Sequence, residues 1–419
     1  MSQSLPKKIL IFSLAYYPKY VGGAEVAIKE ITDRIASDDI EFHVLTLRFD
    51  RNLPRLSKEG NVFVHRVGFT TKDPDMGDLR KFPLHYMKVL WQIWGGVLAA
   101  RLHRKEKFDA VWAMMAHSCG APVALFNLFH PKVPFVLTLQ EGDPPEYIER
   151  KMLPFWPLFV RAFRKADIIQ VISSFLGAWA RRMGATAPIV LVPNAVDTKR
   201  FLQTFSPEEL EALRQKLGKK QGEKYIITTS RLVKKNAVDI VIRAMKFLSA
   251  DTKFLVLGIG PDEDELKKLA KDEGVAERVL FLGQIGHAEL PKYLRISDVF
   301  TRPSRSEGMG NSFVEAMAAS IPVVATPVGG ITDFLFDPKQ NPDKEPTGLF
   351  ANVEDPEDTA RALKEFLENT ELRERCVANA RRMVIGEYDW DLIAKNMREK
   401  VFAPLFSPAI QGGTLGSNS

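Results

Sequence analysis

The sequence predicts an α/β fold built from two doubly wound parallel sheets. Short apolar runs alternate with amphipathic segments of helical spacing along the chain, which is the pattern of strands joined by covering helices. The chain has 419 residues, too many for one ordinary core, so two domains of about 200 residues are expected. A segment rich in charge and proline, residues 194–220, separates two series of strands. We therefore expect two Rossmann-like domains facing each other across a cleft.

The predicted strands are the short apolar runs. In the first half they are Ile9–Phe12, Phe42–Leu47, Ala110–Ala113, Phe135–Leu139, Ile168–Ile172 and Ile189–Val192. The second half repeats the scheme with Tyr225–Thr229, Phe254–Leu257, Val279–Leu282, Val299–Thr301 and Pro322–Ala325.

The domain boundaries follow from this order. Residues 1–197 are expected to form the N-terminal domain, rejoined by a C-terminal helix over residues 390–406. Residues 198–389 are expected to form the second domain, and the polar, glycine-rich residues 407–419 a flexible tail. The first strand follows the start of the chain at once, which argues against a signal peptide, and no apolar run reaches the length that spans a bilayer.

The cysteine content argues against a disulfide-rich or cysteine-rich metal-binding protein. The chain has only two cysteines, Cys119 and Cys376, far apart in sequence. Two such residues cannot form a disulfide framework or a cysteine-rich metal site. We expect a cytoplasmic protein.

The segment Ser304–Ala318 carries the strongest functional signal. A strand precedes it, and Phe313, Val314 and Met317 recur at helical spacing within it. The first helical turn, around Asn311 and Ser312, presents unpaired N–H groups and the positive end of a helix dipole, which suit a diphosphate. Glycines let the backbone approach the ligand closely, and a carboxylate one turn into the helix can accept the hydroxyls of a ribose. The residues are Glu307, Gly308, Met309, Gly310, Asn311, Ser312 and Glu315.

This segment and several others resemble the retaining glycosyltransferases of family 4, also called glycosyl transferases group 1. Glu307 to Met317 matches the Glu-x7-Glu signature of that family, and the other segments follow in family order. They are Val21–Glu25 with the glycine loop at Gly22 and Gly23, Val192–Asp197, Ser230–Val233, Val256–Pro261, Thr326–Ile331 and Thr347–Leu349. The resemblance implies the GT-B fold, a nucleotide-sugar donor and retention of anomeric configuration.

The resemblance also assigns donor residues. Ser230 and Arg231 match the start of the family's donor site, and a guanidinium suits bidentate phosphate contact. Five residues after that arginine the family usually has a lysine, where this chain has Asn236. The adjacent Lys235 is our choice for the second phosphate cation, with Lys234 as the other option.

Three residues are expected on the sugar or acceptor side. Family members often have a histidine at the end of the fourth N-terminal strand, where this chain has Gln140. A glutamine can hydrogen-bond a hydroxyl but takes up no proton at neutral pH. Any acid–base role there therefore passes to Glu141 or is lost. His117 could compensate, although a lone histidine is more often a bystander.

The expected chemistry is the breaking of an anomeric C–O bond, for which the main demand is a clamp on the departing diphosphate. Arg231, Lys235 and the helix start at Asn311 would supply it, while Glu307 would hold sugar hydroxyls. Catalytic residues are thus Glu307, Arg231 and Lys235, and no metal or cofactor is expected. The triplets Asp73–Asp75 and Asp262–Asp264 are interpreted as solvated charge.

The net charge of +6 lies wholly in the first half. Residues 1–200 contain 28 lysines and arginines against 19 aspartates and glutamates, whereas the remainder contains 30 against 33. Within that half, residues 79–107 and 147–165 interleave aromatic and basic side chains, a combination that can lie on an anionic membrane. The alternative is that Trp91, Trp94 and Leu98 simply belong to the core. A nucleic-acid partner is not expected, because no recognised module accompanies the charge.

The sequence thus favours a glycosyltransferase that moves a sugar from a nucleotide diphospho-sugar to a sugar or lipid-linked acceptor, with peripheral contact at the inner face of a membrane. Two alternatives remain open. One is a nucleotide-sugar epimerase or a sugar phosphorylase on the same fold. The other is a nucleotide-sugar-binding protein with little catalysis, slightly favoured by Asn236 and Gln140. The base, sugar, acceptor and oligomeric state do not follow from the sequence.

Overall fold

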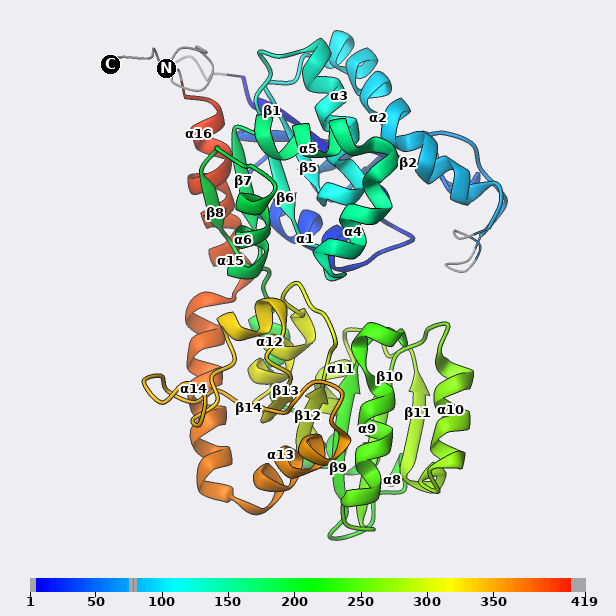
Figure 1. The fold of residues 1–419 in the computed structure, drawn as a ribbon, viewed down its shortest axis with the longest axis vertical. Coiled ribbons are helices and arrows are strands. Elements are labelled where there is room, and N and C mark those ends of the chain that lie inside the picture. Colours follow the sequence, from blue (N-terminus) through cyan, green and yellow to red (C-terminus); the bar gives the residue numbers. More distant parts are fainter. Residues whose placement is uncertain (1–4, 75–77, 79–80, 408–419) are drawn as a thin grey trace. The chain divides into compact units, whose positions relative to one another are not determined.

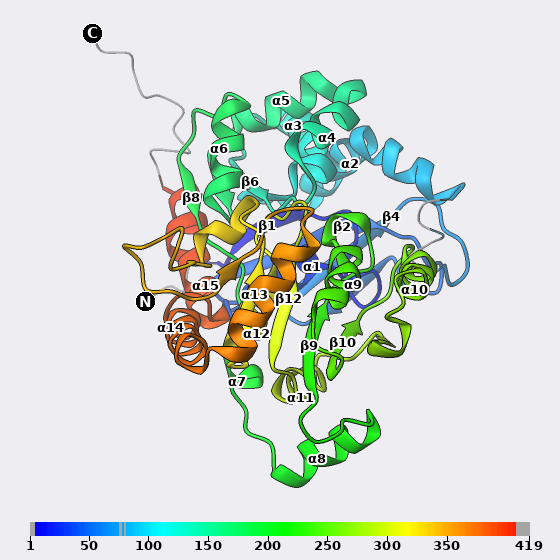
Figure 2. The ribbon, with the colours of Figure 1, turned by 60° about the horizontal axis from the view of Figure 1, so that its bottom comes forward.

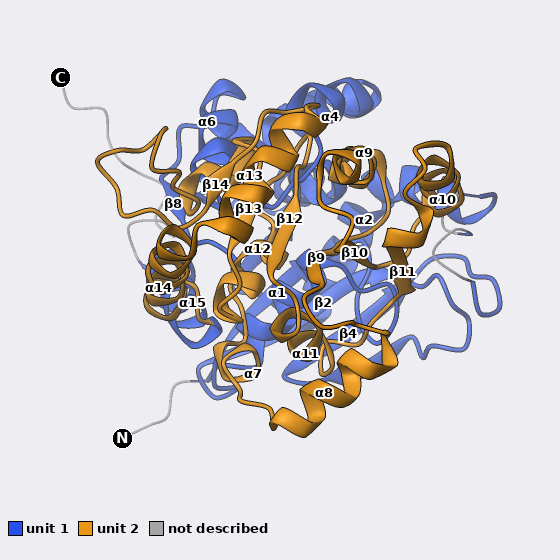
Figure 3. Cartoon of the chain, turned by 90° about the horizontal axis from the view of Figure 1, so that it is seen from below, with its two compact units in different colours: residues 1–194, 390–419 blue, residues 195–389 orange. Residues whose placement is uncertain are grey.

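The computed structural model describes residues 5–74, 78 and 81–407. Its chain divides into two compact units, shown in Figures 1 and 3. Unit 1 contains residues 1–194 and 390–419, and unit 2 contains residues 195–389. The C-terminal segment therefore belongs to unit 1. The predicted flexible tail, residues 407–419, lies outside the described residues except for Ser407.

Unit 1 is built on an eight-stranded sheet among its described residues, in the order β3-β4-β2-β1-β5-β6-β7-β8. All neighbouring strands are parallel except β3 and β4, which pair antiparallel at one edge. The strands are β1 (Lys7–Phe12), β2 (Ile40–Leu47), β3 (Leu56–Glu59), β4 (Val62–Val67), β5 (Ala110–Met114), β6 (Phe135–Leu139), β7 (Ile168–Val171) and β8 (Ile189–Leu191).

Helices cover both faces of this sheet. On one face Phe12 packs edge-on against Trp91 and Phe126 of α2 and α3, and on the other Phe402 of η8 packs against Phe42 and Trp112. The helical segments are α1 (Gly23–Thr32), α2 (Leu84–Glu106), η2 (Ala116–Gly120), α3 (Ala121–Phe129), α4 (Pro145–Met152), η3 (Leu153–Phe155), α5 (Trp156–Lys165), α6 (Ser174–Arg182), α15 (Trp390–Asn396), η8 (Met397–Phe402) and α16 (Ala403–Leu405).

Unit 2 is built on a six-stranded parallel sheet in the order β11-β10-β9-β12-β13-β14. The strands are β9 (Lys224–Thr229), β10 (Thr252–Leu257), β11 (Val279–Gly283), β12 (Val299–Arg302), β13 (Val323–Ala325) and β14 (Leu349–Phe350). The helical segments are α7 (Thr198–Phe201), α8 (Pro207–Lys216), η4 (Lys234–Asn236), α9 (Val238–Ala244), η5 (Met245–Phe247), α10 (Glu263–Asp272), η6 (Ala276–Arg278), α11 (Leu290–Arg295), α12 (Asn311–Ala318), η7 (Gly329–Asp333), α13 (Pro356–Glu368) and α14 (Thr370–Glu387).

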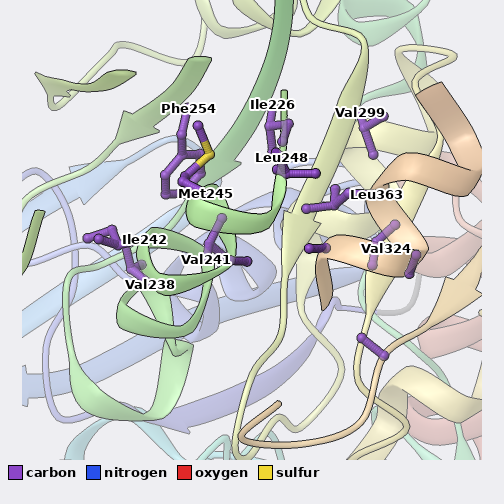
Figure 4. Packing of buried hydrophobic residues seen from close by; sticks show 14 of the residues in the cluster. Ile226, Val238, Val241, Ile242, Met245, Leu248, Phe254, Val299, Val324 and Leu363 are labelled. Atoms are coloured by element: carbon purple, nitrogen blue, oxygen red, sulfur yellow. The ribbon is translucent and has the colours of Figure 1, made fainter. Parts of the chain in front are cut away.

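The core of unit 2 lies between the sheet and helices α9 and α13. Ile226, Val299 and Val324 of the sheet pack with Val241 of α9 and Leu363 of α13, as Figure 4 shows. The next residue along β12, Phe300, points to the opposite face, where its ring lies 5.6 Å from that of Phe313 in α12. Residues alternate between faces of a strand, so both faces of β12 are buried. This places α12 firmly against the end of β12.

The predicted α/β fold with two mostly parallel sheets is confirmed, and every predicted strand is present. Three strands were not predicted: β3, β4 and the two-residue β14. In β4 buried residues alternate with half-buried ones, and β3 lies at an exposed edge. Neither therefore forms the continuous apolar run by which the other strands were recognised.

Candidate functional site

The strand order identifies one edge of each sheet as a candidate binding site. Ligands of open α/β sheets bind beyond the carboxyl ends of the strands, between neighbours whose connections run in opposite directions. In unit 2 this point lies between β9 and β12, which are side by side in Figure 2. Ser230 and Arg231 follow β9, and residues 303–310, here called the donor loop, follow β12. The sheet therefore brings the predicted donor residues to one edge.

The donor loop ends at Gly310, which opens α12 in a left-handed conformation with φ of 88°. A Cβ atom at this position would lie 2.6 Å from the ring of Phe313 and 2.8 Å from Nη2 of Arg302. Only glycine fits this position without strain. No side chain caps α12, so the N–H groups of its first turn, at Asn311 and Ser312, are suited to an anion.

Arg302, the last residue of β12, connects the two ends of the donor loop. Its guanidinium donates to Oε2 of Glu307 at 2.6 Å and to Oγ of Ser312 at 2.8 Å. It also donates to Oγ of Ser304 at 3.2 Å and stacks over the ring of Phe313 at 4.5 Å. This residue was not predicted from the sequence. An arginine at the end of an otherwise apolar strand, directly before the Glu-x7-Glu segment, was the available signal.

The two glutamates have different surroundings. The Glu307 carboxylate accepts from Arg302 through one oxygen and from the N–H of Gly308, at 3.2 Å, through the other. The carbonyl oxygen of Glu307 accepts from the N–H of Gly330 at 3.3 Å, and Gly329 packs so close to it that a Cβ atom there would lie 1.8 Å away. Glu315 is one turn into α12, and burial raises the pKa of its carboxyl, while His287, Arg302 and Arg200 offset part of that rise.

The segment after β9 is held by contacts that explain the departure from the family pattern. Asn236 is buried, and its Nδ2 donates to the carbonyl oxygen of Arg231 at 2.6 Å. Asn236 therefore supports the turn on which Arg231 lies, while the Arg231 side chain is exposed. Ser230 contacts the next strand's loop closely, since a Cβ atom at Gly258 would lie 1.8 Å from its carbonyl oxygen.

The adjacent lysines differ in environment. Lys234 is about two thirds exposed and forms an ion pair with Glu265 of α10. Lys235 is half-buried, and its carbonyl oxygen accepts from the N–H of Arg305, in the donor loop, at 2.7 Å. Arg305 also donates to both carboxylate oxygens of Asp239, at 2.9 and 2.7 Å. The turn that carries Lys235 is thus tied to the donor loop.

In unit 1 the corresponding point lies between β1 and β5. Gly22 and Gly23 follow β1 at the start of α1, and both are exposed. The N–H of Gly22 donates to Oε2 of Glu25 at 2.8 Å, a capping contact that orders this start.

The three predicted sugar-side residues lie together at the ends of β5 and β6. The Glu141 carboxylate is buried and accepts from the N–H groups of His117 and Gln140, at 3.2 and 2.9 Å. Nδ1 of His117 lies 3.5 Å from the same carboxylate, and the Gln140 side chain pairs with that of Asn194, at 3.2 Å. Glu141 is therefore a buried anchor, whereas the half-buried His117 and Gln140 form the accessible part of the cluster.

The described residues show neither a metal-binding cluster nor a membrane-spanning helix. No group of three or more histidine, cysteine, aspartate or glutamate side chains is arranged to hold a metal ion among them. No helix in residues 5–74, 78 and 81–407 has the length and apolar character needed to cross a membrane.

Comparison with known proteins gives matches along most of the chain. The family Glycosyltransferase Family 4 matches residues 21–200, and Glycosyl transferases group 1 matches residues 210–383. An uncharacterized glycosyltransferase of Methanocaldococcus jannaschii is 26% identical over 404 residues, which cover 93% of this chain and 96% of that protein.

Two further proteins extend the comparison. One, from Corynebacterium glutamicum, is a GDP-mannose-dependent monoacylated alpha-(1-6)-phosphatidylinositol monomannoside mannosyltransferase. It is 29% identical over 312 residues, covering 71% of this chain and 77% of its own. The other is the solved structure of a sucrose-phosphate synthase from Thermosynechococcus elongatus, which has a TM-score of 0.77 at 19% identity and covers 96% of this chain and 99% of its own. The fold is accordingly GT-B, and the chain belongs to the family 4 glycosyltransferases, glycosyl transferases group 1.

Proposed function

We propose that this protein transfers a hexosyl group from a nucleotide diphospho-sugar to a sugar or lipid-linked acceptor, with retention of anomeric configuration. The observation that carries the proposal is the donor loop, where an uncapped helix start lies between two glutamates at the edge where β9 and β12 meet. An anion-binding helix start beside carboxylates that can accept hydroxyls fits a ligand containing both diphosphate and sugars. The corynebacterial relative uses GDP-mannose according to its name, which supports the same class of donor.

The leaving diphosphate is stabilised, in this proposal, by Arg231, Lys235 and the first turn of α12. Breaking the anomeric bond puts negative charge on the diphosphate, so groups already oriented toward it lower the barrier most. Glu307 holds hydroxyls of the transferred sugar, and Glu315 holds the ribose. In unit 1, Gly22 and Gly23 stay predicted donor contacts, and Gln140 and His117 predicted contacts of the sugar or acceptor.

Two finer features belong to the proposal. Retention of configuration is what the family resemblance implies, and the proposal places the substitution on the face of the sugar from which the diphosphate leaves. The reaction needs no metal, because two cations and a helix dipole neutralise the leaving group.

The acceptor side includes an exposed apolar face on α2, which supports contact with an anionic membrane. Five side chains at spacings of one to four residues point outward with exposures between 40 and 60%: Tyr86, Val89, Leu90, Ile93 and Trp94. Trp91, by contrast, is core, so α2 contributes both to packing and to a surface. The same segment carries Lys81, Lys88, Arg101 and Arg104, of which all but the half-buried Lys88 are exposed. Arg80, part of the same predicted segment, lies outside the described residues.

The first test concerns the reaction. We expect UDP-, GDP- or ADP-sugars at a hundred times their dissociation constant to stabilise the protein by about 2.7 kcal/mol in thermal denaturation. The stabilising donor should then release its nucleoside diphosphate faster when an acceptor is added, and EDTA should leave that rate unchanged. If no acceptor changes the rate at which the nucleoside diphosphate is released, the epimerase or binding-protein alternatives are favoured. Loss of activity on chelation, restored by Mn²⁺ or Mg²⁺, would refute metal independence.

The second test compares the adjacent lysines. Lys235→Ala should weaken nucleoside diphosphate binding by about 1.5–3 kcal/mol, the range for a hydrogen bond to a charged group. Lys234→Ala is the matched control and should have little effect, because that side chain pairs with Glu265 at the surface. Isothermal titration of both variants decides the matter, and equal effects would show that Lys235 is not the second phosphate cation.

The third test separates the glutamates. Glu315→Gln should weaken the nucleoside diphosphate and the intact donor alike, because ribose is common to both. Glu307→Gln should leave binding of the nucleoside diphosphate nearly unchanged but lower turnover by about 30- to 1000-fold, which corresponds to an activation free energy higher by about 2–4 kcal/mol. Because burial raises the pKa of Glu315, this carboxylate should become protonated at a higher pH than an ordinary glutamate does. Binding of the nucleoside diphosphate by the wild type should therefore weaken as the pH falls through that range. The Glu315→Gln variant should lack this pH dependence. If titration and turnover assays instead show that Glu307→Gln weakens nucleoside diphosphate binding and that Glu315→Gln lowers only turnover, then Glu307 binds the ribose and Glu315 the transferred sugar.

The fourth test addresses the α2 face. Leu90→Glu combined with Ile93→Glu should lower affinity for phosphatidylglycerol vesicles about 30-fold, since each charge near an anionic surface contributes about 1 kcal/mol. Ile385→Glu is the control, because Ile385 is comparably exposed but lies in unit 2. Sedimentation at low salt measures the effect. Wild-type protein that does not sediment with such vesicles would exclude the membrane contact.

A further inference from the structure

We infer that Arg302 is a positioning residue that holds the Glu307 carboxylate and the first turn of α12 as one rigid unit. The inference rests on the proposed function of the donor loop and deepens it, because no role had been assigned to this arginine. If Glu307 contacts the sugar and the α12 start contacts the diphosphate, Arg302 determines how far apart these two contacts are held.

The geometry supports this role because the contacts of Arg302 lie on both sides of the donor loop. Ser304 is at the start of the loop, Glu307 within it and Ser312 in the helix that follows. A guanidinium has a planar fork of five N–H groups, so a single side chain can contact three acceptors in fixed directions. The stack on Phe313 fixes the plane of that fork.

Burial makes this arrangement specific to arginine. The side chains of Arg302 and Glu307 are only 8 and 13% exposed. Removing one partner of a buried ion pair leaves the other charge buried without a counter-charge, which destabilises the folded protein. A lysine would keep the positive charge but, as a single compact ammonium without the planar fork, could not hold all three acceptors in the same directions.

The contact leaves Glu307 able to bind a sugar. Each carboxylate oxygen has two acceptor positions. One on Oε2 is taken by Arg302 and one on Oε1 by the N–H of Gly308. Each oxygen therefore retains one position for a hydroxyl. Arg302 acts through Glu307 and Ser312, so it orients the groups that contact the substrate.

The activity test is a double-mutant cycle with UDP-glucose and GDP-mannose as donors, followed by release of UDP or GDP. Arg302→Met keeps an unbranched side chain that can lie over Phe313 and should lower kcat by about 100-fold, the effect of displacing a catalytic contact by about 1 Å. Arg302→Lys should recover part of this loss. The double variant Arg302→Met, Glu307→Gln should be no slower than the slower single variant, because coupled residues are not additive. Multiplying effects would show that Arg302 does not act through Glu307.

A matched control excludes a general loss of stability. Arg278 is a half-buried arginine of unit 2 whose guanidinium donates to the carbonyl oxygens of Met245, Leu248 and Ser249. Arg278→Met should lower the melting temperature but leave kcat unchanged below it. If Arg302→Met, like Arg278→Met, lowers the melting temperature but leaves kcat unchanged below it, the positioning role is refuted.

A second measurement does not depend on turnover. Backbone hydrogen exchange of residues 304–315 without nucleotide should be faster in Arg302→Met than in the wild type, and unchanged in Arg278→Met. Unchanged exchange in Arg302→Met would overturn the inference even if the enzyme is active. Faster exchange in Arg302→Met would still support the rigid loop if the wild type used none of the UDP-, GDP- or ADP-sugars, a result that would count against the proposed function alone.

Discussion

The parallel order of the strands is the constraint on which the candidate site depends. Because neighbouring strands run in the same direction, every segment that follows a strand begins at the same edge of its sheet. In unit 2 this brings Arg231, the turn of Lys235 and the donor loop together, although they are separated by up to 80 residues along the chain. In unit 1 it does the same for the residues after β1, β5 and β6.

Two arginines hold the loops at the binding edge of the unit 2 sheet in place. Arg302 connects the donor loop to α12, and Arg305 connects the same loop to Asp239 and to the turn of Lys235. Both guanidiniums are already engaged by protein acceptors. They therefore order the segments that carry ligand contacts, a role different from that of the exposed Arg231.

The departures from the family pattern acquire physical roles at these edges. Asn236, in place of the usual lysine, is buried and supports the backbone of Arg231 through a hydrogen bond that a lysine side chain would not satisfy in the same way. Gln140, in place of the usual histidine, pairs with Asn194 next to the buried Glu141. Both substitutions are thus accommodated by local hydrogen bonds, and neither leaves a disrupted loop.

The sequence by itself determined the fold class, the strands that form continuous apolar runs and the family, because these depend on apolar periodicity and on the spacing of Glu307, Gly310 and Glu315, which are local. From the sequence we also predicted Lys235 as the second phosphate cation in place of the missing lysine, with Lys234 as the other option. Only the tertiary structure decided the role of Asn236, the separate environments of Lys234 and Lys235, and the connection made by Arg302. These depend on hydrogen bonds between side chains and backbone groups, whose directions no sequence spacing specifies. For the same reason β3, at the edge of the unit 1 sheet, and its neighbour β4 escaped prediction: their pairing, rather than a continuous apolar run, makes them strands.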